Sequence, residues 1–152
     1  MELPTEKLLT PLWAIPRLKF ELLDSFWKEE TNRKLNKTQE RTMLAIKFFA
    51  GENMTALSKI AGVEKGSFTH IVDRLQDEGF ITRKRDSKDK RNTILELTAK
   101  GRAYLSNLDT LIKKYFEGKF SVLSAEEKES FFTACNTIIE MMEVIISGKD
   151  LA

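Results

Sequence analysis

The sequence contains a single cysteine and a single histidine among its 152 residues, which limits the chemistry available to it. Cys135 has no second cysteine for an internal disulfide, and together with His70 it does not make a metal site with ordinary ligand spacing. A catalytic set of nucleophile, histidine and acid would have to use His70, and no clustered acidic loop suggests a carboxylate metal site. We therefore expect no enzymatic activity, no metal and no cofactor.

Long apolar runs are also missing from the sequence. No stretch of about 18 apolar residues occurs, so no membrane span is expected. The N-terminus carries Glu2 and Glu6 and lacks the basic start and apolar block of a secretory signal. With 41% hydrophobic and 32% charged residues, the chain is typical of one soluble globular domain. We expect a cytoplasmic protein.

Positive charge is concentrated in one part of the chain. The whole sequence has a net charge of +2, but residues 81–102 alone hold eight basic and three acidic side chains. The two ends of the chain are acidic, with a net charge of −2 over residues 1–30 and −3 over 103–152, while residues 31–80 carry +2. A localised basic patch is typical of a surface that contacts phosphate groups.

Local signals before this patch predict a helix-turn-helix, with helices over 37–50, 56–61 and 64–78. Asn36 and Gln39 have the spacing of a capping box at the start of the first helix. Thr55 is the predicted N-cap of the second helix, which ends at Gly62, and Gly79 ends the third. Two short helices joined by a glycine-containing turn are typical of DNA-binding proteins.

The third helix has an apolar face and a polar face. The apolar residues recur at i, i+3, i+4 and i+7, which predicts a buried stripe of Phe68, Ile71, Val72 and Leu75. The opposite face is small and polar near its N-terminal end, so it suits the major groove. The residues expected to contact base edges or phosphates are Lys65, Ser67, Thr69, His70 and Arg74, and Thr55 is expected to donate to a phosphate. Any surface helix has a polar outer face, so this helix alone does not decide the function.

A hairpin follows, with strands predicted over 80–85 and 93–98 and a polar loop between them. Six basic residues are expected to serve this wing in DNA binding, namely Arg83, Lys84, Arg85, Lys88, Lys90 and Arg91. The planar guanidinium of Arg91 suits the narrow, electronegative minor groove. Asp73 and Asp89 are expected to brace the wing, with Asp89 holding Arg91. The alternative is a solvated charge run with no partner.

Both ends of the chain carry more apolar side chain than one small winged domain needs. The first helix is expected to begin near Pro11 or Pro16 and to run to about residue 30, because a proline interrupts a helix interior. Thr98 is expected to cap a helix to about Lys119, and the capping box at Ser124 starts a last helix to about Ile146. These helices indicate a homodimer. A ligand pocket and a dimer core are both open as the role of Trp13, Phe20, Phe26 and Trp27.

The spacing of these motifs over about 65 residues resembles the MarR family of bacterial transcription regulators. The matching residues are Leu35-Asn36, Gln39, Leu44, Leu57 to Ala61, Val72 to Leu75, Gly79 to Arg83, Asp86, Asp89 to Arg91 and Leu97 to Gly101. The resemblance implies a mainly α-helical fold in three parts, namely N-terminal dimerisation residues 1–34, a winged helix-turn-helix lobe 35–101 and C-terminal dimerisation helices 102–152.

The resemblance also implies a function. It implies a homodimeric repressor that binds double-stranded DNA at a pseudo-palindromic operator, with helix 64–78 in the major groove, Arg91 in the minor groove and release by a small ligand. Some members sense oxidants through a cysteine near the first helix. Cys135 instead lies in the last predicted helix among apolar residues, where a desolvated thiol resists becoming a thiolate, so we expect it to pack. The alternative function is a winged-helix module that binds protein without specific DNA binding.

Overall fold

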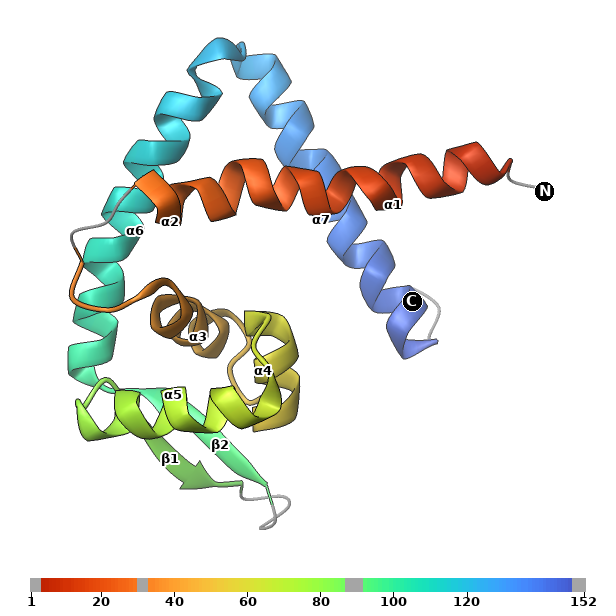
Figure 1. Ribbon diagram of the computed structural model, residues 1–152. Coiled ribbons are helices and arrows are strands. Elements are labelled where there is room, and N and C mark those ends of the chain that lie inside the picture. The colour runs from red at the N-terminus through yellow and green to blue at the C-terminus, as the bar shows by residue number, and fades with distance from the viewer. Residues whose placement is uncertain (1–3, 30–32, 87–91, 149–152) are drawn as a thin grey trace. The chain divides into compact units, whose positions relative to one another are not determined.

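The computed structural model describes residues 4–29, 33–86 and 92–148. Its elements are α1 (Thr5–Lys19), the π-helical turn η1 (Phe20–Asp24), α2 (Ser25–Glu29), α3 (Lys37–Phe48), α4 (Met54–Ala61), α5 (Lys65–Asp77), β1 (Ile81–Arg85), β2 (Thr93–Leu97), α6 (Ala99–Lys119), the 3-10 turn η2 (Phe120–Val122) and α7 (Ala125–Ser147) (Figure 1). The chain divides into two compact units, Met1–Lys113 and Lys114–Ala152. The predicted mainly α-helical fold with one antiparallel hairpin is confirmed.

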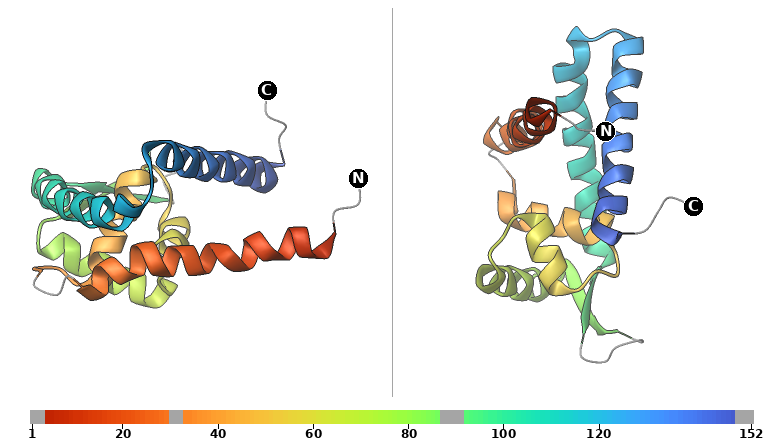
Figure 2. Two further views of the ribbon diagram at one scale, coloured as in Figure 1. Left: turned by 90° about the horizontal axis from the view of Figure 1, so that it is seen from above. Right: turned by 90° about the vertical axis from the view of Figure 1, so that its right-hand side faces the viewer.

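The lobe core lies where α3, α4 and α5 pack against one another and against the hairpin. In the right-hand view of Figure 2 the hairpin extends beyond these three helices. Three of the four residues of the predicted α5 stripe are fully buried, and Ile71 is half-buried. Other large buried side chains of this core are Met43, Leu57, Phe80, Ile81, Leu95 and Leu105. Burial of this stripe orients the opposite, polar face of α5 away from the core.

Helix caps explain where the helices of the lobe begin. The predicted capping box of α3 is present, because the side chain of Asn36 accepts from the Gln39 N–H and the side chain of Gln39 accepts from the Asn36 N–H, both at 3.0 Å. The predicted cap of α4 is wrong. Asn53 caps this helix, since its side chain accepts from the Ala56 N–H at 3.0 Å, and Thr55 lies within the first turn. Gly62 then ends α4 with a φ of 65°.

The hairpin is antiparallel, with Ile81 opposite Leu97 and Arg85 opposite Thr93. Its base is joined to α6 through Thr98, whose hydroxyl donates to the carbonyl of Gly79 at 2.6 Å and accepts from the N–H of Gly101 at 3.1 Å. This contact is the predicted cap at the start of α6. It fixes the start of α6 against the beginning of β1.

The N-terminal helix differs from the prediction. It begins at Thr5, and both Pro11 and Pro16 lie inside it. A proline removes one hydrogen bond and crowds the preceding turn, but the turns on either side remain intact, so the helix continues at a cost. The irregularity appears further along, in the π-helical turn Phe20–Asp24.

The aromatic residues at this end divide into two kinds. Trp13 and Phe20 are exposed, with 78% and 45% of their surface accessible. Phe26 and Trp27 are instead buried within the chain itself. The short helix α2 turns these two residues into the core, and a role of the four aromatic residues in a ligand pocket or a dimer core stays a prediction.

The second unit contains the end of α6, η2 and α7. Ser124 and Glu127 form the predicted capping box at the start of α7. An aromatic cluster joins the two helices around Phe120, whose ring is stacked on Phe116 and packs against Phe131 and Phe132. Most apolar side chains of α7 are exposed, and Cys135 is half-buried. Among the described residues α7 is also the one helix long and apolar enough to cross a membrane, which is weak evidence because a core helix passes the same test.

Candidate nucleic-acid interface

The outward face of α5 presents a row of exposed polar and basic side chains. All five residues predicted there are exposed, namely Lys65, Ser67, Thr69, His70 and Arg74. The Thr69 hydroxyl donates to the backbone carbonyl of Lys65 at 3.3 Å, and the Arg74 Nε lies 3.1 Å from a Glu78 carboxylate oxygen. Near its N-terminal end this face has little side-chain bulk, because Gly66 and Ser67 lie there. Such a face can approach base edges closely.

A second group of polar residues surrounds the N-terminal end of α4. A cavity of about 550 Å³ lies there, and its lining includes Asn53, Thr55, Lys59, Asn92 and Thr93. Thr55 is exposed, as a donor to phosphate has to be. Of this group only Thr55 was among the predicted DNA contacts. Asn92 and Thr93 come from the other end of the lobe sequence, and the bridge between Asn53 and Ile94 brings them beside α4.

The strands of the wing carry three of the six predicted basic residues. Arg83 donates to Asp73 of α5 at 2.5 Å, so the structure brings together a wing residue and its proposed brace. Lys84 pairs with Glu96 across the hairpin at 2.5 Å, and Arg85 is exposed. The other four predicted wing residues, Lys88, Asp89, Lys90 and Arg91, lie outside the described residues.

Behind this surface a fully buried carboxylate connects α2, α3 and α6. Glu40 accepts from the indole N–H of Trp27 at 2.7 Å and from the hydroxyl of Tyr104 at 2.6 Å, and the Nε of Arg33 lies 3.0 Å away. Burial and the bond to Glu40 raise the pKa of Tyr104 to about 12. No local sequence pattern indicates this cluster, because Trp27, Glu40 and Tyr104 are far apart along the chain.

A second charged contact joins η1 to α3. Asp24 lies 3.0 Å from the Nζ of Lys37 and 3.9 Å from a guanidinium nitrogen of Arg41. Burial alone would raise the pKa of Asp24, but its hydrogen bond and Coulombic attraction to Lys37, with a contribution from Arg41, outweigh burial and lower it. Arg41 also approaches the turn at Gly62, where an added Cβ would lie 2.7 Å from its guanidinium. Arg41 of α3 therefore lies beside the turn before α5, where it leaves no room for a side chain at position 62.

Comparison with known proteins agrees with this geometry. A family model described as MarR matches residues 35–93, which contain α3, α4, α5 and β1. The HTH-type transcriptional regulator BilQ of Clostridium symbiosum is 34% identical over 99 residues, which cover 65% of this chain and 69% of BilQ. The chain belongs to the MarR family.

Two further relatives extend this match. The HTH-type transcriptional repressor YetL of Bacillus subtilis is 32% identical over 97 residues, covering 59% of this chain and about half, 54%, of YetL. The solved structure of the transcriptional repressor CouR bound to a 23-mer DNA duplex is 25% identical, with a TM-score of 0.62, and the match covers 91% of this chain and 99% of CouR. The MarR segment 35–93 contains every predicted contact residue, whereas α1 and α7 lie outside it.

Proposed function

We propose that this MarR-family chain is a transcriptional repressor that binds double-stranded DNA in a sequence-specific manner. The observation that carries the proposal is the division of α5 into a buried apolar stripe and an exposed face of hydroxyl, imidazole and cationic groups. CouR, which matches over most of this chain, is a repressor solved on a DNA duplex. YetL is also named as a repressor.

In the proposed complex α5 lies in the major groove and the wing lies along the adjacent minor groove. Ser67, Thr69 and His70 read base edges, while Lys65 and Arg74 neutralise phosphates. Thr55 donates to the backbone from the first turn of α4. Arg91 enters the minor groove, with Asp89 as its brace.

We propose that two copies of the chain form the active unit. The apolar side chains left exposed on α1 and α7 support this, since contiguous apolar surface is expensive to leave in water. The largest of them include Leu12, Trp13, Phe132, Ile138, Ile139, Ile145 and Ile146. A two-fold dimer reads half-sites about 10 base pairs apart or a multiple of this, which implies a pseudo-palindromic operator. Sedimentation of the full chain and of Ile139→Glu tests the dimer.

We also propose a cytoplasmic location, where the chromosome is accessible, and release from the operator by a small ligand. A selection of bound fragments from the source genome tests the function as a whole. The proposal expects enriched fragments that share an inverted repeat and tighter binding to them than to scrambled duplex. Arg91→Ala is expected to weaken this binding by about 1–3 kcal/mol with the dimer intact. Enrichment of fragments without any shared element would contradict sequence-specific recognition.

A further inference from the structure

The π-helical turn η1 joins two helices that have different surroundings. Figure 1 shows α1, η1 and α2 as one continuous helical rod. On the C-terminal side of η1, Phe26 and Trp27 of α2 are buried, with 0% and 6% of their surface accessible. On its N-terminal side, every α1 side chain that the structure describes is exposed. The rod therefore passes from the core to the surface at η1.

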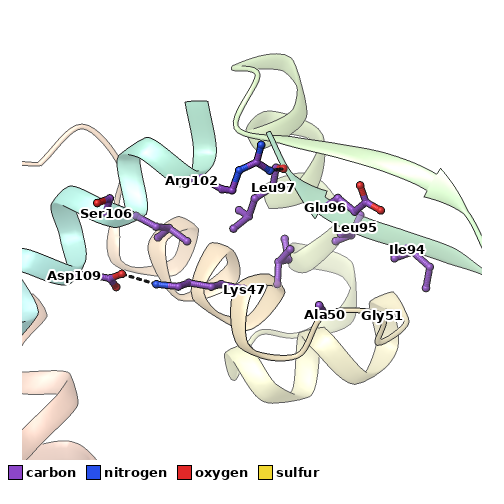
Figure 3. Close-up of a pocket in the computed structure, with 12 residues that line it drawn as sticks. Lys47, Ala50, Gly51, Ile94, Leu95, Glu96, Leu97, Arg102, Ser106 and Asp109 are labelled. Carbon is purple, nitrogen blue, oxygen red and sulfur yellow. Dashed lines mark hydrogen bonds and ion pairs between the residues drawn. The ribbon is translucent and has the colours of Figure 1, made fainter. Parts of the chain in front are cut away.

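The C-terminal part of this rod is anchored to the lobe. The indole N–H of Trp27 donates to Glu40 of α3 at 2.7 Å, and Asp24 at the end of η1 lies 3.0 Å from the Nζ of Lys37, also of α3. The helix α3 is itself joined to α6 by an ion pair, which the dashed line in Figure 3 marks. The lobe therefore fixes the rotation of α2 about the rod axis, and the geometry of η1 then determines the rotation of α1.

A regular α-helix through this segment would place the apolar residues of α1 and α2 on one face. Leu9 precedes Trp27 by 18 residues, and Ile15 precedes Phe26 by 11 residues. These separations are about five and about three turns of α-helix, so the two members of each pair would lie in line along the rod. The apolar face of α1 would then be directed toward the same side as the residues that pack into the lobe.

The turn η1 changes this alignment by about one residue. The backbone N–H of Ser25 donates to the carbonyl of Phe20, five residues earlier, and the Ser25 hydroxyl donates to the same carbonyl at 3.2 Å. A backbone bond of this kind closes a turn that holds one residue more than an α-helical turn. Because each residue rotates an α-helix by about 100°, the apolar face of α1 is rotated away from the buried face of α2. Leu9 and Ile15 are accordingly 46% and 40% exposed.

We propose that the extra residue of η1 directs the apolar face of α1 away from its own lobe and toward a second copy of the chain. The residues of this face recur at intervals of three and four and are Leu9, Leu12, Trp13 and Ile15. A second copy is the occupant because α1 and α7 carry most of the exposed large apolar side chains, and a two-fold contact covers both helices. The inference rests on the proposed dimer and adds the feature of the chain that aligns it.

Deletion of Glu21 tests this alignment. Glu21 lies in η1 and its side chain is exposed, so the deletion shortens the turn by one residue without removing a buried group. We expect the deletion variant to dimerise at least about tenfold more weakly than the parent in sedimentation equilibrium, because its α1 is rotated by about 100°. Glu21→Ala removes the same side chain and keeps the length, and it is expected to dimerise as tightly as the parent.

A compensated variant separates the rotation of α1 from local damage to η1. It combines the deletion of Glu21 with one alanine inserted between Lys19 and Phe20, so the original number of residues returns with a different sequence. We expect this variant to recover the dimer affinity of the parent. Circular dichroism and urea unfolding are expected to show an intact lobe in the deletion, substitution and compensated variants.

Two substitutions in α1 test the direction of its apolar face without any change to η1. Ile15→Glu places a charge on this face, and Thr10→Glu places the same charge at an exposed position about 140° around the helix from Ile15. We expect Ile15→Glu to weaken the dimer at least about tenfold and Thr10→Glu to leave it unchanged. This pair of variants decides the question if the deletion variant does not fold.

Four results with a dimeric parent would overturn the proposal. They are unchanged dimer affinity after deletion of Glu21, an equal loss in Glu21→Ala, a compensated variant that stays as weak as the deletion variant, and an Ile15→Glu chain that dimerises like the parent. A failure of the proposed function appears differently, since the parent itself would then sediment as a monomer or would not bind an operator. The parent is therefore measured first, beside its variants.

Discussion

Asp73 on α5 accepts a hydrogen bond from the guanidinium of Arg83 on β1 across 2.5 Å. The pair joins the helix proposed to read DNA to the strand that begins the wing. Both side chains are partly exposed, with 47% and 31% of their surface accessible, so the pair contributes modestly to stability. We therefore expect the pair to affect the orientation of the wing more than the stability of the folded chain.

The Asp73→Asn variant distinguishes two effects on DNA affinity, namely the orientation of the wing and the negative charge of Asp73. Simple electrostatics predicts tighter DNA binding when an acidic group near phosphate is removed. Because the wing loses its brace, we expect Asp73→Asn to weaken binding instead, by up to about fivefold. Fluorescence anisotropy with a labelled operator measures this. Asp77→Asn makes the same charge change on an exposed part of α5 and is expected to bind as tightly as the parent or more tightly. Equal tightening by both variants would contradict the bracing role.

Gly101 holds the start of α6 against the hairpin and tolerates no side chain. A Cβ at this position would lie 2.1 Å from the backbone carbonyl oxygen of Phe80. Since backbone has to move, we expect Gly101→Ala to lower the free energy of unfolding by roughly 1–3 kcal/mol or more in urea titrations. Gly118→Ala is the control in the same helix, where a Cβ meets nothing within 4 Å. It is expected to be neutral or to stabilise by up to about 1 kcal/mol. Similar losses in both variants would refute the steric explanation.

The buried carboxylate of Glu40 is expected to be the most sensitive polar group of the lobe. Glu40→Ala leaves Arg33 without its counter-charge and removes the acceptor of Trp27 and Tyr104. Breaking a buried pair in this way costs about 3–5 kcal/mol of unfolding free energy. Tyr104→Phe removes one bond to a charged acceptor and is expected to cost less, about 1.5–3 kcal/mol. Urea unfolding ranks the two variants, and a larger loss in Tyr104→Phe would show that Glu40 is not the centre of the cluster.

The contact of Asp24 with Lys37 predicts a pH dependence on the acidic side. The pKa of Asp24 is lowered from its ordinary value of 3.8 in the folded chain, so the unfolded chain takes up the proton first as pH falls. The stabilisation is therefore present above the unfolded pKa and is lost as pH falls through the folded pKa. We expect Asp24→Asn to be less stable than the parent at neutral pH and the difference to shrink below about pH 4.

Lys37→Met removes the cation and keeps Asp24, so it is the matched variant for this test. It is expected to lose much of the same acid-dependent stability in urea titrations carried out at a series of pH values. A difference between Asp24→Asn and the parent that stays constant on acidification would mean that packing, not charge, accounts for the effect.

Local sequence patterns were sufficient to predict most helices and strands of the lobe. The capping box at Asn36 and Gln39 and the apolar stripe of α5 depend on residues within one or two turns, and both are present. The cap of α4 was misplaced because Asn53 and Thr55 are both good caps. Asn53, which caps the helix, also forms an antiparallel β-bridge with Ile94, a residue 41 positions later in the sequence. A local sequence pattern does not reveal this long-range contact.

The burial of Trp27 and the course of α1 also differ from what the sequence predicts, and the first of these depends on contacts between segments far apart in the chain. Trp27 faces Glu40, and Glu40 faces Tyr104, across 13 and 64 residues of sequence, so no short-range pattern predicts that Trp27 is buried. The prolines of α1 suggested a helix start because a proline is unfavourable in a helix interior. The helix nevertheless begins at Thr5 and passes through both prolines.

The salt dependence of DNA affinity tests the central claim most directly. If the face formed by α5 and the wing neutralises about six phosphates, the logarithm of affinity falls against the logarithm of salt concentration with a slope near −5. Lys65→Ala is expected to make this slope shallower by about 1, and Lys114→Ala, an exposed lysine in the second unit, is expected to leave it unchanged. A flat response to salt, or equal slopes for Lys65→Ala and the parent, would contradict DNA binding through this face and would favour a winged helix that binds protein.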